Sequence, residues 1–334
     1  MLWQKDAATG APRAKRHVKS SQANATPATD GRTVVALLGS QGLFAFSAEG
    51  EPLWHQDLGV LDPGLLGDTG SQWGHGSSPI LAGDRVIVQV DRHRDSFLAA
   101  YDLATGKQLW KVARDERPVW ATPTYFPAGG RDELIVIGGN FVRGYRATSG
   151  EELWRFADQA EVKTPTPFVA GERVILAGGY RGRPLLALKA GGSGDLSERE
   201  GHSGALLWRS ERGGPYTSTP VVYGDHVYAV TDTGVLTVYD LASGQQLSRQ
   251  RTSDTYSASL VAGDGKVYLT GEGGTVTVLA AGAEPKVLAE NAMNEPCFAT
   301  PAIAGGSLYL RCRGHLYAIA RTAEKPAPPA APAR

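Results

Sequence analysis

A short phrase recurs along this chain and constrains its fold more than any single residue does. Residues 101–110 read YDLATGKQLW, and altered copies stand at residues 44–54 (FAFSAEGEPLW), 144–154 (GYRATSGEELW) and 239–247 (YDLASGQQL). Self-similarity of this kind is the signature of a repeat architecture, in which each copy is one supersecondary unit. We therefore expect a series of similar units that pack against each other.

Each unit opens with a hydroxyl-bearing residue that is usually followed by proline. The openings are Thr26-Pro27, Ser78-Pro79, Thr122-Pro123, Thr166-Pro167, Thr219-Pro220, Ser259-Leu260 and Thr300-Pro301. Proline is tolerated at the first residue of a strand, so each opening predicts the start of a short strand. The openings recur at roughly 40–50 residues, which is the size of one four-stranded propeller blade.

The rest of each unit predicts three further strands, as the second unit illustrates. A tight turn at Gly83-Asp84 leads into a β-branched run at residues 85–90 (RVIVQV). The third strand ends in a turn where Gly106 is expected to supply a positive φ. The fourth strand carries Leu109-Trp110, and we expect this Trp and its counterparts to pack between neighbouring sheets.

Seven openings predict an all-β protein, a β-propeller of four-stranded antiparallel blades around a central axis. The seventh unit supplies three strands, whereas residues 2–5 (LWQK) match a fourth strand without its first three. We expect this N-terminal strand to close the last blade and complete a seven-bladed ring. The alternative is an eight-bladed propeller truncated before Met1. The propeller domain is expected to span residues 1–322.

Two segments outside the repeat are also interpretable. The insertion at residues 190–205 (AGGSGDLSEREGHSGA) is glycine-rich and is predicted to be a flexible surface loop. Residues 323–334 are rich in Pro and Ala, which predicts a disordered tail.

The repeat phrase, the Ser/Thr-Pro opening and the turn of residues 224–228 (GDHVY) together resemble the pyrroloquinoline-quinone (PQQ)-type β-propeller repeat. The resemblance covers residues 1 to about 322. That family includes quinoprotein alcohol dehydrogenases, the lipoprotein of the outer-membrane β-barrel assembly machine, which has no cofactor, and sensor domains. The resemblance therefore implies a fold rather than one activity.

The dehydrogenase branch makes a specific demand that this sequence does not meet. The resemblance would imply a quinone held between a Trp and a disulfide of adjacent cysteines, beside a Glu, an Asn and an Asp. Cys297 and Cys312 are not adjacent, and no such acidic set can be matched. We therefore predict no cofactor, and PQQ with calcium is the alternative. The two cysteines flank a predicted hairpin and are either buried thiols or a disulfide, which would indicate an oxidising compartment.

Composition excludes several classes of partner. Lys+Arg and Asp+Glu both number 34, so the basic surplus of a nucleic-acid-binding protein is missing. No apolar run approaches the roughly 18 residues of a membrane span, so we expect no transmembrane segment. Residues 1–6 do not resemble the start of a secretory signal, and we expect none in this chain. We expect a monomer.

The candidate site lies where the units open. In a propeller the first strand of each blade is innermost, so the residues just before it rim the central channel. There the side chains mix aromatic groups with both signs of charge, which suits a pocket or a partner-facing rim, although any polar channel mouth gives a similar pattern. The candidate binding residues are Trp73, His75, Trp120, Lys163, Tyr216, Tyr256 and Glu295.

No catalytic or metal-ligating set is predicted, because the histidines are scattered without metal-site spacing. The leading expectation is a non-enzymatic propeller that binds a protein or peptide partner in the bacterial cell envelope, or periplasm. The compartment is implied by the resemblance. The alternatives are a quinone-dependent redox enzyme and a small-ligand sensor in which Trp73 and Trp120 stack on the ligand.

Overall fold

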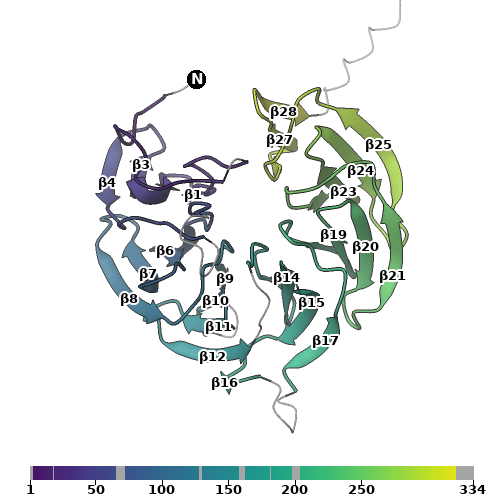
Figure 1. Ribbon diagram of the computed structural model, residues 1–334, viewed down its shortest axis with the longest axis horizontal. Coiled ribbons are helices and arrows are strands. Elements are labelled where there is room, and N and C mark those ends of the chain that lie inside the picture. Colours follow the sequence, from purple (N-terminus) through teal and green to yellow (C-terminus); the bar gives the residue numbers. More distant parts are fainter. Residues whose placement is uncertain are drawn as a thin grey trace, which may run out of the picture.

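The computed structural model describes residues 3–17, 19–64, 72–127, 130–157, 162–180, 182–197 and 204–320. Seven antiparallel sheets are arranged as blades around a ring, which confirms the predicted all-β propeller of seven blades (Figure 1). The helical content of the described residues is one 3-10 turn, η1 (Gly39–Gln41). The predicted tail at residues 323–334 lies outside the described residues.

The first four blades follow the predicted order of strands. Blade 1 comprises β1 (Ala28–Thr29), β2 (Thr33–Leu37), β3 (Leu43–Ser47) and β4 (Pro52–Gln56). Blade 2 comprises β5 (Ile80–Ala82), β6 (Arg85–Val90), β7 (Ser96–Asp102) and β8 (Gln108–Arg114). Blade 3 comprises β9 (Thr124–Phe126), β10 (Glu133–Ile137), β11 (Phe141–Arg146), β12 (Glu152–Ala157) and an added β16 (Gly194–Asp195). Blade 4 comprises β13 (Phe168–Ala170), β14 (Arg173–Gly179), β15 (Gly182–Lys189) and β17 (Leu206–Ser210).

The last three blades continue the same pattern with one difference. Blade 5 comprises β18 (Val221–Tyr223), β19 (His226–Val230), β20 (Val235–Asp240) and β21 (Gln246–Arg251). Blade 6 comprises β22 (Val261–Gly263), β23 (Lys266–Thr270), β24 (Thr275–Ala280) and β25 (Lys286–Ala292). Blade 7 comprises β26 (Ala302–Ala304), β27 (Ser307–Arg311) and β28 (Leu316–Ala320), three strands rather than four.

Hydrogen bonds between the unit openings tie the inner strands together. At most of the openings, the hydroxyl of the Ser or Thr accepts the backbone N–H of the preceding opening residue: Thr26 donates to Ser78 (2.9 Å) and Ser78 to Thr122 (3.0 Å). The same link recurs from Thr219 to Ser259 (2.9 Å) and from Ser259 to Thr300 (3.0 Å). The hydroxyl that marks these openings in the sequence therefore joins one blade to the next.

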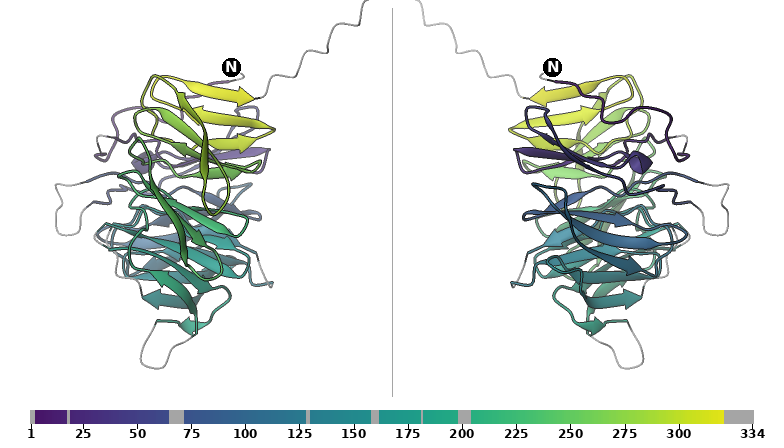
Figure 2. Two further views of the ribbon diagram at one scale, coloured as in Figure 1. Left: turned by 90° about the vertical axis from the view of Figure 1, so that its right-hand side faces the viewer. Right: turned by 90° about the vertical axis from the view of Figure 1, so that its left-hand side faces the viewer.

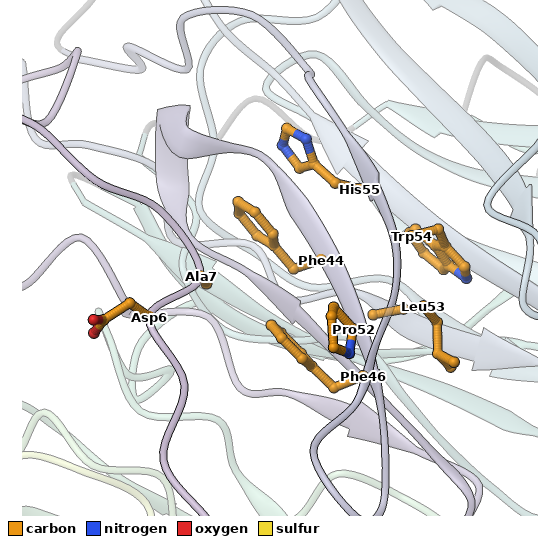
Figure 3. A pocket seen from close by; sticks show the side chains of 9 residues that line it. Asp6, Ala7, Phe44, Phe46, Pro52, Leu53, Trp54 and His55 are labelled. Atoms are coloured by element: carbon orange, nitrogen blue, oxygen red, sulfur yellow. The ribbon is translucent and has the colours of Figure 1, made fainter.

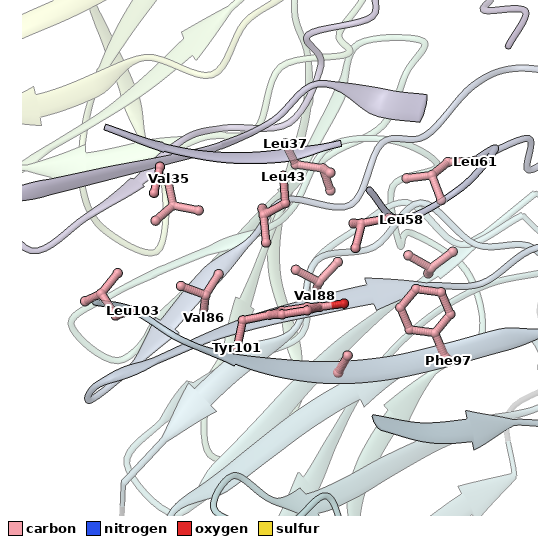
Figure 4. Packing of buried hydrophobic residues seen from close by; sticks show 13 residues of the cluster. Val35, Leu37, Leu43, Leu58, Leu61, Val86, Val88, Phe97, Tyr101 and Leu103 are labelled. Carbon is pink, nitrogen blue, oxygen red and sulfur yellow. The ribbon is translucent and has the colours of Figure 1, made fainter. Parts of the chain in front are cut away.

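The core lies between blades. Between blades 1 and 2, Val35 and Leu43 on one sheet face Val86 and Tyr101 on the other, and all four are buried (Figure 4). Buried positions alternate along each strand, so the residues on one face of a blade pack against the residues on the facing side of the next blade. Stacking of this kind buries both faces of every blade that has a neighbour on each side.

The Leu-Trp strand supplies the expected contact between neighbouring blades. The indole N–H of Trp54 in β4 donates to the carbonyl of Leu103 in blade 2 at 2.9 Å, and its ring lies against Gly106. Trp110 repeats this contact with Ala147 at 3.0 Å, and Trp208 repeats it with Leu241 at 3.0 Å. Trp154 differs, because its N–H donates to Glu133 within blade 3.

The predicted pairing of the N-terminal strand with the last blade is not formed by the described residues. Residues 3–6 are not in a strand, and β28 has no outer neighbour there. Trp3 instead donates its indole N–H to Ala48 in blade 1 at 2.8 Å and lies against Gly50. Trp3 therefore contacts blade 1 as Trp54 contacts blade 2, and this contact holds the segment on blade 1. Leu2 lies outside the described residues.

Blade 7 is consequently the least covered sheet. Figures 1 and 2 place it on the same side of the ring as the start of the chain. Leu316 is 71% exposed and Ile319 46% exposed, values unusual for apolar strand residues. Of the two states that the sequence left open for Cys297 and Cys312, buried thiols or a disulfide, the structure shows the disulfide.

The described part of the insertion at residues 190–205 contains a short strand where a flexible loop was predicted. Gly194 and Asp195 form β16, which pairs in parallel with β12 of blade 3 in the register Trp154–Gly194. Leu196, the next residue, is buried in the core between blades 3 and 4. Although the segment is rich in glycine, burial of the apolar side chain of Leu196 stabilises its position at the edge of the sheet. Residues 198–203 of this insertion lie outside the described residues.

Candidate functional site

The predicted rim residues all precede the first strand of a blade, as the propeller geometry requires. Trp73 and His75 precede β5, Trp120 precedes β9 and Lys163 precedes β13. Tyr216, Tyr256 and Glu295 precede β18, β22 and β26. The structure brings the first four together, and it places the other three elsewhere around the channel.

Trp73 and Trp120 form an aromatic pair at the channel mouth. Their ring centroids are 5.4 Å apart, and the Trp120 indole N–H donates to the carbonyl of Gly74 at 2.8 Å. Both side chains are partly exposed. The edge of the His17 ring approaches Trp73 with a centroid separation of 6.3 Å. Partly exposed aromatic rings held in a fixed position are typical of recognition surfaces.

His75, two residues after Trp73, is 7% exposed. Burial lowers the pKa of His75 to about 4, so the ring is neutral at physiological pH. Its Nε2 atom makes no hydrogen bond to any described residue. Gly76 follows, and a Cβ atom at that position would stand 2.9 Å from Trp120. The missing side chain of Gly76 thus lets Trp120 pack closely over this loop.

Lys163 connects the aromatic pair to blade 3. Its side chain is fully buried, and its Nζ donates to the carbonyl of Gly138 at 2.9 Å. Its own carbonyl accepts the N–H of Trp120 at 2.9 Å. Val162, the preceding residue, has a φ of 48°, a strained conformation for a β-branched side chain. Lys163 therefore supports the position of Trp120 from below rather than offering its charge to solvent.

A second aromatic pair lies on the blade 4 side of the ring. The rings of Tyr180 and Tyr216 are 5.6 Å apart. Burial raises the pKa of Tyr216, so its hydroxyl keeps its proton. Beside it Arg183 forms an ion pair with Asp232 at 2.9 Å. Tyr180 is 42% exposed and offers a second contact surface that the sequence did not single out.

Two predicted rim residues have structural roles. Tyr256 is 1% exposed and belongs to the core between blades 5 and 6. The carboxylate of Glu295 accepts hydrogen bonds from Gly314 N–H at 2.5 Å and from the Tyr317 hydroxyl at 2.7 Å, and it contacts His315. Glu295 thereby holds the turn between β27 and β28. These hydrogen bonds lower the pKa of Glu295, and the largest effect comes from the backbone N–H of Gly314.

An N-terminal strap crosses the channel mouth, and the candidate residues named from the sequence did not include it. We define the strap as residues 13–17 and 19–22; it lies in the dark purple segment that runs towards the centre of the ring in Figure 1. The N–H of His17 donates to the carbonyl of Trp73 at 3.0 Å. Lys19 pairs with Glu272 of blade 6 at 2.9 Å. The available signal was the basic run RAKRHVK at residues 13–19.

Two hollows lie on the outer wall of the ring. One, of about 350 Å³, lies between residues 6–7 and the strands β3 and β4, where Phe44, Phe46 and His55 line it (Figure 3). The other, of about 340 Å³, lies between β21 and blade 6 and is lined by Arg251, Thr277 and Glu290 among others.

The residues present do not fit a quinone site. The Cys297–Cys312 disulfide is buried between blades 6 and 7 with Val276 and Leu310, and so it does not face the aromatic pair as one side of a cofactor sandwich. Within the described ranges, no three His, Cys, Asp or Glu residues are grouped to hold a metal ion.

Comparison with known proteins identifies the relatives of this chain. A family model described as outer membrane protein assembly factor BamB matches residues 1–120 and 94–325. The solved structure of BamB from Moraxella catarrhalis matches with a TM-score of 0.66, covering 86% of this chain and 82% of that chain at 15% identity. At this identity the structural likeness shows the fold alone. No curated protein matches in sequence. Among the described residues no helix is long and apolar enough to cross a membrane.

Proposed function

Because the chain belongs to the BamB family of PQQ-like propellers, we propose that it is a protein-interaction scaffold of the bacterial cell envelope. The partner is a protein or peptide that binds at the channel mouth. The relative is named as an assembly factor, which supports a role in bringing other proteins together. The propeller supplies a rigid ring, and the loops before each first strand supply the contacts.

The observation that carries this proposal is the Trp73–Trp120 pair. Trp73 is partly exposed, is braced by Trp120 at 5.4 Å, and its carbonyl is fixed by the N–H of His17 at 3.0 Å. A fixed aromatic ring loses little conformational entropy on binding, and such residues dominate the affinity of protein interfaces. The Cys297–Cys312 disulfide supports an oxidising compartment such as the periplasm.

Site-specific crosslinking tests the location of the partner. A photoreactive phenylalanine analogue replaces Trp73 in one variant and Leu109, an exposed residue of the outer wall, in a control variant. After irradiation of intact cells, the analogue at position 73 is expected to give a discrete protein adduct in the envelope fraction, and the analogue at position 109 none. Adducts of the same size at both positions, or none at position 73, would contradict binding at the mouth.

A quantitative variant complements the crosslinking. Trp73→Ala removes the exposed ring, and truncating an aromatic anchor of an interface reduces affinity by about 2 kcal/mol or more. Tyr309→Ala serves as the control, because it removes a ring from blade 7 that is 40% exposed, more than that of Trp73, and lies away from the aromatic pair. Partner capture by Trp73→Ala should fall at least tenfold while Tyr309→Ala retains it. Unchanged capture by Trp73→Ala would overturn the assignment.

A further inference from the structure

Positive charge is denser in the N-terminal strap than elsewhere in the chain, because four Lys or Arg residues fall within residues 13–19. Residues 7–29 contain no Asp or Glu, although acidic and basic residues are equal in number over the whole sequence. Arg13, Lys15, Arg16 and Lys19 carry full positive charges, and His17 stands between them. The strap thus concentrates positive charge at the channel mouth of a neutral protein.

Two of these charges anchor the strap to the ring. The Arg13 guanidinium pairs with Asp57 at 2.8 Å and also contacts the carbonyl of Ser40. Lys19 pairs with Glu272 at 2.9 Å, on the other side of the mouth. The anchors belong to blades 1 and 6, so the strap spans the channel between them. Arg13 lowers the pKa of Asp57 to about 2, and the pair stays ionised in ordinary buffers.

The remaining two charges are available to a ligand. Lys15 and Arg16 are exposed. Arg16 donates to the carbonyl of Ser20 at 2.6 Å, a contact that orients the guanidinium without neutralising its charge. For Lys15, no ion pair with another described residue is recorded. The strap backbone here lies on Gly74, where a Cβ atom would stand 3.1 Å from the carbonyl of Lys15 and 3.4 Å from Cα of Arg16. The backbone that carries these two side chains is therefore held against the loop of Trp73.

We propose that Lys15 and Arg16 form a docking surface for an acidic segment of a partner protein. The proposal rests on the proposed function and specifies the chemistry of the partner. Two adjacent cations pair with carboxylates, while the ring of Trp73 contacts an apolar side chain of the same segment. Nucleic acid is disfavoured because the chain carries no net charge and the positive surface is short, whereas a phosphate backbone needs an extended basic surface.

Peptide binding provides the direct test. The probe is a fluorescein-labelled deca-glutamate peptide, with a deca-lysine peptide as its counterpart, measured by fluorescence anisotropy with the full chain. We expect deca-glutamate to bind and deca-lysine not to bind. Because screening weakens exposed charge pairs, the affinity for deca-glutamate should fall several-fold between about 50 and 300 mM salt.

A matched pair of variants localises the binding. Lys15→Glu/Arg16→Glu reverses the two strap charges, and Lys107→Glu/Arg249→Glu reverses two exposed charges on the outer wall, so the net charge changes equally. The strap variant should bind deca-glutamate at least tenfold more weakly, and the wall variant should match wild type. An equal loss in both variants, or an unchanged affinity in the strap variant, would overturn the proposal. Thermal melts that coincide with wild type confirm that both variants are folded.

Two further probes separate this proposal from its competitors. Tighter binding of duplex DNA or of phosphatidylglycerol vesicles than of deca-glutamate would reject an acidic protein segment as the partner. The crosslinking experiment at position 73, repeated in the Lys15→Glu/Arg16→Glu variant, separates the scaffold function from the acidic docking segment. An adduct that persists there at full yield leaves the scaffold function standing and rejects the acidic segment; loss of the adduct supports the docking surface.

Discussion

At the scale of single residues, the repeat phrase encodes an interaction between a Trp and a glycine of the following blade. Gly106, Gly150 and Gly244 have φ values of 72°, 75° and 70°, as their turns predict. A Cβ atom at Gly106 would also stand 2.6 Å from the ring of Trp54. The sequence indicated the positive φ but not this second constraint, because the Trp belongs to another unit and reaches Gly106 only after the blades stack.

A pair of glycine variants separates these two constraints. Gly106→Ala places a methyl group both at a positive φ and against Trp54, whereas Gly265→Ala meets only the positive φ of 69°, with no atom within 4 Å. Gly265→Ala should destabilise the protein by about 1–2 kcal/mol. Gly106→Ala should cost about 1–3 kcal/mol more, because the ring of Trp54 must shift. Chemical denaturation measures both, and equal effects would show that the Trp contact is unimportant.

His75 gives the protein a pH-dependent stability. Its pKa is lowered by burial from 6.5 to about 4, so between these values the unfolded chain binds a proton that the folded protein does not. Stability is therefore complete above about pH 6.5 and is lost as the pH falls towards 4, by up to about 3 kcal/mol. His75→Gln should lack this component. Denaturant titrations of both proteins at pH 7.5 and 4.5 measure the difference, and parallel losses would be inconsistent with a buried neutral His75.

At the scale of elements, strand order and blade size were predictable because each strand carries its own local signal. The departures occur where long-range packing decides. Gly194–Asp195 joins blade 3 because the neighbouring Leu196 is buried there, which a glycine-rich composition does not reveal. Blade 7 has three strands in the described part of the chain because Trp3 is held by Ala48 of blade 1. Neither choice is visible in a local sequence pattern.

Blade 7 should depend on its disulfide more than the rest of the ring does. The bond between Cys297 and Cys312 closes a loop with a sequence separation of 15, and a loop of that size gives about 3 kcal/mol in the chain-entropy model. In the double variant Cys297→Ala/Cys312→Ala, amide exchange in β27 and β28 should accelerate, while β10 and β11 in the covered blade 3 keep their protection. Equal acceleration in both blades would mean that the disulfide stabilises the ring as a whole.

At the scale of the whole molecule, the number of blades was predictable from the openings, whereas the site was only partly so. Trp73, His75, Trp120 and Lys163 were named from the rule that first strands lie innermost, and they do meet. Tyr256 and Glu295 satisfied the same rule but are used for packing and for a turn. Which rim side chains point outwards depends on the neighbouring blade. The strap was missed because it belongs to no repeat.

The ion pair between Lys19 and Glu272 should hold the strap across the mouth. Lys19 is 54% exposed, so replacing its partner with Glu272→Gln should change the global stability by less than about 1 kcal/mol. Amide exchange at residues 15–17 and 19–22 should nevertheless accelerate. Glu151→Gln breaks a surface pair with Arg146 on another part of the ring, in which the carboxylate is more exposed, and serves as the control. Unaltered strap exchange in Glu272→Gln would show that the other contacts suffice.

The indole contacts run in one direction. The indole N–H of Trp54 in blade 1 donates to blade 2, that of Trp110 donates to blade 3, and that of Trp208 in blade 4 donates to blade 5. In each case the Trp belongs to the earlier blade in the chain. Blade 7 has three strands in its described part, and no Trp there donates such a hydrogen bond to a following blade. When the carboxyl end is pulled, the blades should therefore unfold one after another in reverse sequence order. Blade 7 should separate first, while the indole hydrogen bonds between the earlier blades are still formed.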